Sequence, residues 1–154
     1  MAALASWTPR GTADAADVSQ RILARLLRSR DLSAAALSRR VEEGLPFRIF
    51  AELAECLGLT HEAFGALLRL SPSTLYRRRR GGRFAFAESD RLWRYLHLYA
   101  AAADVLEGSD AAADWLRSEL PALSGGTPLE AARNAPGARA AEELLTRLEF
   151  GVFA

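Results

Sequence analysis

The sequence predicts an all-α fold from three observations. Half of the 154 residues are hydrophobic, alanine is abundant, and valine and isoleucine are sparse, a composition that favours helices over strands. Apolar residues recur at helical spacing along most of the chain. Helix-capping residues and glycine stops enclose these stretches, so the chain divides into several helices of ordinary length.

The N-terminal part, residues 1–44, is predicted to be a helical extension. Residues 1–13 are mostly small and contain a proline and a glycine, so we expect them to be loose. A helix is expected over residues 14–30, where apolar side chains share one face, and a shorter one over 33–43, ending at Gly44. The extension carries no recognisable motif, and contact between two copies of the chain is one role open to it.

Three short helices are predicted in close succession in the middle of the chain. The first covers residues 47–57, with apolar residues at i, i+3, i+4 and i+7, and Gly58 ends it. Thr60 is a good N-cap for the second, and Ser71 is a good N-cap for the third. The second and third helices are joined by a very short turn, which is the arrangement of a helix-turn-helix.

The third helix has the composition of a helix that enters the major groove of DNA. Ser73 and Thr74 form a small polar first turn that can approach base edges, and Leu75 can fix the helix on the preceding one. The run Arg77 to Arg80 supplies donors for phosphates and guanine edges. Taken alone, four arginines before a glycine stop are more often a solvated helix end, where they favour the helix dipole. The cap, the short turn and the preceding helix favour DNA binding.

Successive residues on a helix point about 100° apart, so four consecutive arginines cannot all reach one groove. We expect Arg77 to lie near the bases and Arg80 near phosphate. Arg78 or Arg79 is expected to be tied to an acid of the following helix, Glu88 or Asp90, or to the protein body. The predicted DNA-binding residues are Ser73, Thr74, Tyr76, Arg77, Arg80 and Arg83.

The charge of the chain is divided by region. All 20 basic residues are arginine, and the formal net charge is only +1. Residues 1–68 hold eight arginines and eight acids, whereas residues 69–94 hold eight arginines and two acids, a net charge of +6. Residues 95–154 hold four arginines and nine acids, a net charge of −5. This asymmetry indicates an anion-binding middle and an acidic end that meets another partner.

The longest helix is expected over residues 87–107, closed by Gly108. A further helix, capped by Ser109, carries Trp115, which is most simply a core residue. A capping box at Thr127 begins another short helix.

The last helix is expected to follow Pro136-Gly137 and to end at Gly151. The chain then finishes on apolar residues, which is unusual for a terminus. These residues either fold back onto the body or insert into a pocket of a partner, and their physical chemistry alone does not decide between the two.

The sequence offers no enzymatic or metal-binding constellation. Cys56 is the single cysteine and has no identifiable base, and the two histidines lack a carboxylate–histidine pattern. We expect His61 to face solvent and His97 to adjoin a core helix. Phosphate-binding glycine motifs are missing, so we predict no catalytic residues, no metal and no cofactor. The opening residues lack a signal-peptide pattern and no run approaches about 20 apolar residues, so a cytoplasmic protein without a membrane association is expected.

Several separated motifs together resemble one family. Within residues 45–154 the chain contains, in order, a GLT…LS helix pair, TLYRRRR, AESDRLWR, GGTPLEAAR, PGAR and the ending LLTRLEFGV. Through these motifs the chain resembles the Xre/MbcA/ParS-type antitoxins of RES–Xre toxin–antitoxin modules. It departs from the family pattern at Phe84-Ala85-Phe86, where a less aromatic linker is usual.

The resemblance implies an Xre-like helix-turn-helix bundle followed by a small helical toxin-binding domain. The division would place DNA binding in residues 45–107 and toxin binding in residues 108–154. It implies a type II antitoxin that neutralises a RES-type, NAD-consuming toxin from the adjacent gene by covering its active site, and that represses its own operon. A homodimer, and a hetero-oligomer with the toxin, are expected. The resemblance places toxin contact at Arg147, Glu149, Phe150, Gly151, Val152, Phe153 and Ala154.

Two other functions are compatible with the residues. One is a plain helix-turn-helix transcriptional regulator whose C-terminal part only dimerises. The other is an interaction module that does not bind DNA at all.

Overall fold

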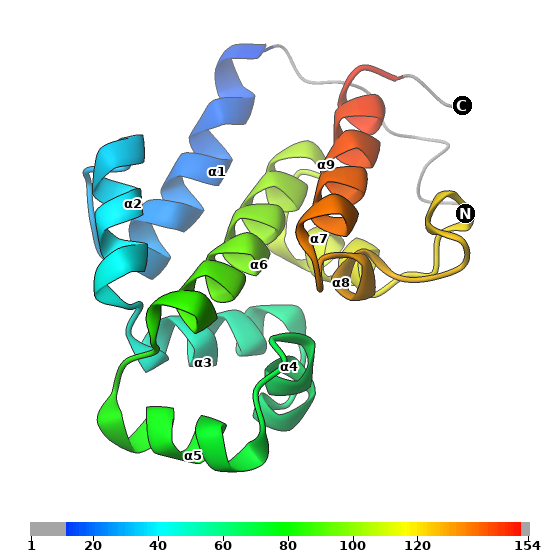
Figure 1. Ribbon diagram of the computed structural model, residues 1–154. Coiled ribbons are helices and arrows are strands. Elements are labelled where there is room, and N and C mark those ends of the chain that lie inside the picture. Colours follow the sequence, from blue (N-terminus) through cyan, green and yellow to red (C-terminus); the bar gives the residue numbers. More distant parts are fainter. Residues whose placement is uncertain (1–11, 152–154) are drawn as a thin grey trace.

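The computed structural model describes the backbone of residues 12–151, with side chains from Val18 onward. The described part contains nine α-helices and one short 3-10 helix, with no strand beyond an isolated bridge between Pro46 and Arg83. The predicted all-α class is confirmed (Figure 1). The helices are α1 (Thr12–Leu27), α2 (Ala34–Glu43), α3 (Phe47–Leu57), α4 (His61–Leu67), α5 (Pro72–Gly81), α6 (Phe86–Val105), α7 (Ser109–Leu116), η2 (Pro121–Leu123), α8 (Pro128–Ala131) and α9 (Ala135–Glu149).

Helix α6 is the centre of the fold. It contacts α1, α2, α7 and α9, and it runs between the lower and upper parts of the molecule in Figure 1. Its buried residues extend around most of its circumference, and its alanines let neighbouring helices approach closely. The fully buried residues of α6 include Leu92, Leu96, Leu98, Tyr99, Ala100, Ala102 and Ala103.

The N-terminal helix belongs to the same core. Its four apolar residues between 22 and 27 are buried, and α1 packs on α6 and α3. The end of α1 is held by two arginines, since Arg40 donates to the Leu27 carbonyl at 2.8 Å and Arg48 donates to the Leu26 carbonyl at 2.9 Å. The helix ends three residues earlier than expected because Arg28 turns into the left-handed region (φ 49°). Most of the residues that we expected to be loose, 1–11, lie outside the described part of the chain.

An aromatic cluster joins α3, α4 and the segment before α6. Phe50 stacks on Phe64 with 4.8 Å between ring centroids, and Phe84 stacks on Phe47 at 5.6 Å. The expectation that His61 faces solvent is wrong, because its half-buried ring lies edge-on to Phe50 and Phe47. Phe84 therefore supplies a buried ring that packs on Phe47 and Phe50 of α3.

Two predicted helix starts in the C-terminal part are shifted. Ser109 is the first residue of α7 and makes no cap with its side chain, because Gly108 occupies the N-cap position. Helix α9 begins at Ala135, so the Pro136-Gly137 pair lies inside its first turn, and Asn134 is the N-cap. Glycine is needed at 137 because a Cβ there would lie 1.9 Å from the Ala131 carbonyl oxygen of α8.

Candidate nucleic-acid interface

Helices α4 and α5 form the predicted helix-turn-helix. Thr60 and Ser71 accept hydrogen bonds from the backbone N–H groups of Ala63 and Thr74, so both predicted N-caps are confirmed. Leu75 packs on Gly65 of α4, where an added Cβ would lie 3.1 Å from a Leu75 methyl carbon. This close approach fixes the angle between the two helices, and the predicted role of Leu75 is confirmed.

Helix α5 lies across one end of the molecule and has no buried residue (Figure 1). Its first turn is organised by hydroxyl groups, since Ser71 Oγ lies 2.9 Å from Thr74 Oγ1 and 3.2 Å from Ser73 Oγ. Arg77 Nη2 donates to Thr74 Oγ1 at 3.2 Å. The first turn and the first arginine are therefore arranged together on one exposed part of the helix.

The outward face of α5 carries four of the predicted DNA-binding residues. Ser73, Tyr76, Arg77 and Arg80 are exposed and follow one another at spacings of three, one and three residues. The Arg80 guanidinium lies 5.9 Å from the centre of the Tyr76 ring, which is a cation–π distance. Arg79 is also exposed. Because these side chains are already exposed, the face can present hydroxyls, a phenol and guanidinium groups to a groove of DNA without a rearrangement of the fold.

Arg78 is the arginine of the run that is tied to the protein body. Its Nε and Nη2 donate to the two carboxylate oxygens of Glu88 at 2.7 and 3.2 Å, and Glu88 also accepts from the Ala85 N–H at 2.8 Å. Burial opposes the charge of Glu88, but the hydrogen bonds from Arg78 and Ala85 outweigh it and lower the pKa of this carboxyl. The hydrogen bonds that Arg78 donates to Glu88 likewise raise the pKa of Arg78. One partly buried ion pair thus joins α5 to the start of α6.

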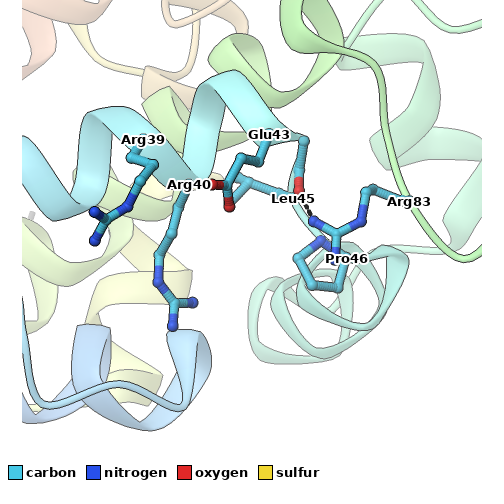
Figure 2. A pocket seen from close by; sticks show the side chains of 7 residues that line it. Arg39, Arg40, Glu43, Leu45, Pro46 and Arg83 are labelled. Atoms are coloured by element: carbon cyan, nitrogen blue, oxygen red, sulfur yellow. Dashed lines mark hydrogen bonds between the residues drawn. The ribbon is translucent and has the colours of Figure 1, made fainter.

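Arg83, the sixth predicted DNA-binding residue, lies apart from this face. It follows the left-handed Gly82 that ends α5, and its guanidinium donates to the Gly44 carbonyl. Figure 2 shows it beside Pro46, opposite Arg39 and Arg40 of α2, around a cavity of about 320 Å³ that Glu43 also lines. The structure therefore separates Arg83 from the other five and groups it with two arginines of α2.

The predicted toxin-binding residues begin at the far end of the molecule from α5. Phe150 follows α9 with 65% of its surface exposed, and Arg147 and Gly151 are exposed beside it (Figure 1). Glu149 is half-buried. The remaining predicted residues, 152–154, lie outside the described part of the chain. Trp115 is buried in the core, as its simplest interpretation predicted.

Two polar groupings were not predicted. His97 Nδ1 of α6 lies 3.1 Å from Glu142 Oε1 of α9, a pair separated by 45 residues that no local pattern could reveal. A cavity of about 330 Å³ is lined by Arg69, Arg91, Arg94 and Arg133, together with Asn134 and Ala135. The net charge of residues 69–94 signalled three of these arginines, and nothing in the sequence connected Arg133 to them.

Among the side chains of residues 18–151, no group of three or more His, Cys, Asp or Glu is placed to hold a metal ion. In the same part of the chain, no helix has both the length and the apolar character that crossing a membrane requires.

Comparison with protein families gives two matches, which cover successive parts of the chain from residue 36 onward. The model of the antitoxin Xre-like helix-turn-helix domain matches residues 36–97, which include α3 to α5 and most of α6. The model of the antitoxin Xre/MbcA/ParS C-terminal toxin-binding domain matches residues 101–151, which include α7 to α9. No curated protein matches the chain significantly.

Proposed function

The chain belongs to the Xre/MbcA/ParS-type antitoxins, and we propose that it neutralises a RES-type toxin from the adjacent gene and represses its own operon. The two matched domains identify a type II antitoxin with a helix-turn-helix and a toxin-binding domain. In the proposal, the C-terminal end covers the NAD-binding active site of the toxin. Residues 45–107 carry DNA binding and residues 108–154 carry toxin binding.

The observation that carries the proposal is the position of the two candidate surfaces. Helix α5 and the end of α9 lie at opposite ends of the molecule (Figure 1). A toxin seated on the end of α9 therefore leaves the outward face of α5 open to DNA. One chain could then neutralise its toxin and occupy its operator at the same time.

The toxin contact is assigned to Phe150 and its neighbours. A large apolar side chain that is 65% exposed at the end of a helix provides an anchor that a partner pocket can bury. Residues 95–154 have a net charge of −5, which suits a toxin site built to accept an anionic dinucleotide. Arg147, Glu149 and residues 151–154 complete the proposed contact.

Operator binding is assigned to the exposed face of α5, with Arg77 near base edges and Arg80 near phosphate. A palindromic operator would be read by two copies of the chain, so we propose a homodimer on DNA and a hetero-oligomer when toxin is bound. These partners place the chain in the cytoplasm.

A growth experiment tests toxin neutralisation. The product of the adjacent gene is expressed alone, with the full chain, or with the chain ended after Glu149. We expect rescue by the full chain only, because the truncation removes Phe150 and every proposed contact residue after it while leaving the buried face of α9 in place. Phe150→Ala should weaken rescue, and Phe86→Ala, a control at a similarly exposed phenylalanine on another surface (57% exposed), should not.

Each other outcome has a definite meaning. Rescue by the truncated chain would move the toxin contact to the body of α7 to α9. A harmless neighbouring gene, or no rescue, would favour the plain helix-turn-helix regulator. DNA binding is tested separately by its salt dependence, since four to six phosphate contacts predict a log–log slope of about −4 to −5. A slope near zero would leave only an interaction module.

A further inference from the structure

The cavity lined by four arginines joins the two halves of the chain. Arg69 lies in the turn between α4 and α5, Arg91 and Arg94 lie on α6, and Arg133 lies between α8 and α9. Among the side chains of residues 18–151, no carboxylate makes an ion pair with any of the four. Glu88 is near enough for Arg91 to lower its pKa, but its oxygens are held by Arg78.

The two inner arginines are already fixed by backbone carbonyls. Arg91 is half-buried and donates from Nη1 to the Leu68 carbonyl at 2.7 Å, and Arg94 donates from Nη1 to the Ala132 carbonyl at 3.3 Å. A guanidinium has five N–H groups, so both retain donors for a ligand. The outer pair, Arg69 and Arg133, is exposed at the rim. Because the inner arginines are already held in place, a ligand that binds them loses little free energy to the ordering of side chains.

Tyr95, a buried residue of α6, feels three of these arginines. Its hydroxyl donates to the Leu129 carbonyl at 3.0 Å, so it ties α6 to α8. Burial raises the pKa of Tyr95 to about 12, while the positive charges of Arg133, Arg94 and Arg69 act in the opposite direction. Three guanidinium groups from separate segments therefore act on one point of the structure, which makes an anion the complementary ligand.

The cavity lies next to the end of α5 that enters DNA. Arg69 is two residues before the N-cap Ser71, so the cavity continues the surface of the first turn of α5. At the other end of the helix, beyond Gly82, lies the group of Arg39, Arg40 and Arg83 (Figure 2). A ten-residue helix is about 15 Å long, close to the width of about 12 Å of the major groove, so its two ends can reach the two phosphate backbones when the helix lies across the groove.

We propose that the cavity of Arg69, Arg91, Arg94 and Arg133 binds a backbone phosphate of the DNA that α5 contacts. The C-terminal toxin-binding domain thus supplies, through Arg133, part of the DNA interface. The N-terminus of α9 adds positive potential, but little hydrogen bonding, because Asn134 already accepts from Gly137 N–H and Pro136 has no N–H. The proposal rests on DNA binding by the helix-turn-helix, and the experiment separates the two.

The test measures binding of the full chain to two fluorescent 30-base-pair duplexes by anisotropy, from low to moderate salt. One duplex comes from the region upstream of the gene, and the other has a random sequence. We expect Arg133→Ala to weaken binding to both by about three- to tenfold, and to reduce the salt slope by about 0.9, because a phosphate contact is independent of sequence. Arg139→Ala, an equal charge change on the exposed surface of α9 outside the cavity, should bind as wild type.

A second variant guards against a folding effect. Arg69 occupies the left-handed region (φ 57°), so Arg69→Asn removes the charge with a residue that tolerates this conformation. It should weaken binding like Arg133→Ala, and the double variant should lose less than the product of the two single losses, because both arginines hold one phosphate. Circular dichroism checks that each variant is folded.

Arg77→Ala distinguishes the possible failures. If it weakens binding while the folded Arg133→Ala and Arg69→Asn variants bind as wild type, the phosphate site is wrong and DNA binding stands. If Arg133→Ala leaves DNA binding unchanged but abolishes growth rescue, the cavity serves the toxin, which also overturns the proposal. Wild-type chain that binds neither duplex would overturn DNA binding and this site together.

Discussion

Helices α5 and α9 carry the two candidate binding surfaces, and they are attached to the core by different forces. Helix α5 has no buried residue and is held by the half-buried Leu75 and by the Arg78–Glu88 pair. Helix α9 buries Ala138, Ala141 and Leu145 against α6 and α8. The position of α5 therefore depends on an ion pair as well as on the packing of one side chain. The position of α9 depends mainly on the burial of apolar side chains.

This difference fits what each helix presents. A helix that binds DNA must leave most of its surface polar and exposed, so few side chains remain to anchor it. A helix whose end meets a protein partner can bury one face fully and expose only its terminal residues. The comparison predicts that the attachment of α9 is weakened most by removing volume from its buried side chains. The attachment of α5 is weakened most by removing the charge of its ion pair.

The largest effect is expected from Leu145→Ala on α9. Leu145 is 2% exposed, and truncating a buried leucine removes transfer free energy and leaves a cavity, so the free energy of unfolding should fall by about 3 kcal/mol. Urea denaturation measures it. Leu144→Ala, at the half-buried neighbouring position, is the control and should cost clearly less. Equal losses at both positions would mean that α9 is not held by its buried face.

A smaller but more local effect is expected from Glu88→Gln. The change leaves Arg78 without its charged partner, and hydrogen bonds between charged groups contribute about 1.5–3 kcal/mol. We expect the free energy of unfolding to fall by about 2 kcal/mol. Amide hydrogen exchange should accelerate in α5 more than in α9. Uniform acceleration in both helices would show that the ion pair supports the whole fold rather than the attachment of α5.

The sequence predicted α5 better than it predicted the surroundings of α5. Ser71, Pro72 and Gly82 act within the helix itself, so the bounds and first turn follow from local chemistry. The separation of one tied arginine from its exposed neighbours followed from the helical repeat, and a bond from Arg78 to Glu88 was among the expected pairings. These predictions succeeded because each depends on residues at most ten positions apart.

Predictions that depend on distant segments were incomplete. The grouping of Arg83 with α2 and the approach of Arg133 to α6 arise when segments about 40 residues apart in the sequence pack together, and the contact of His61 with Phe50 arises when α4 folds back on α3. Helical periodicity identifies which face of a helix is buried but not which helix covers it. Arg133 in particular lies in a turn between two C-terminal helices, where an isolated arginine gives no functional signal.

Acid conditions should affect α5 before α9. The pKa of Glu88 is lowered in the folded chain, so its contribution to stability is complete above its ordinary value of 4.5 and is lost as the pH falls through the lower folded value. Between pH 6 and pH 3, the wild type should lose more unfolding free energy than Glu88→Gln does. Thermal unfolding of both proteins at several pH values measures this difference. Parallel curves would indicate that Glu88 has the same pKa in the folded and unfolded chains.

The smallest effect is expected at the hydrogen-bonded pair of His97 on α6 and Glu142 on α9, whose environment differs from that of Arg78 and Glu88. The side chains of His97 and Glu142 are 48% and 40% exposed, whereas those of Arg78 and Glu88 are 29% and 10% exposed. Water solvates the exposed pair whether or not it forms, so Glu142→Gln should change the free energy of unfolding by less than about 0.5 kcal/mol. Urea denaturation of Glu142→Gln and Glu88→Gln under the same conditions compares the two losses of unfolding free energy directly. If the two substitutions cost the same, burial does not set the strength of these pairs, and α5 is no more dependent on charge than α9.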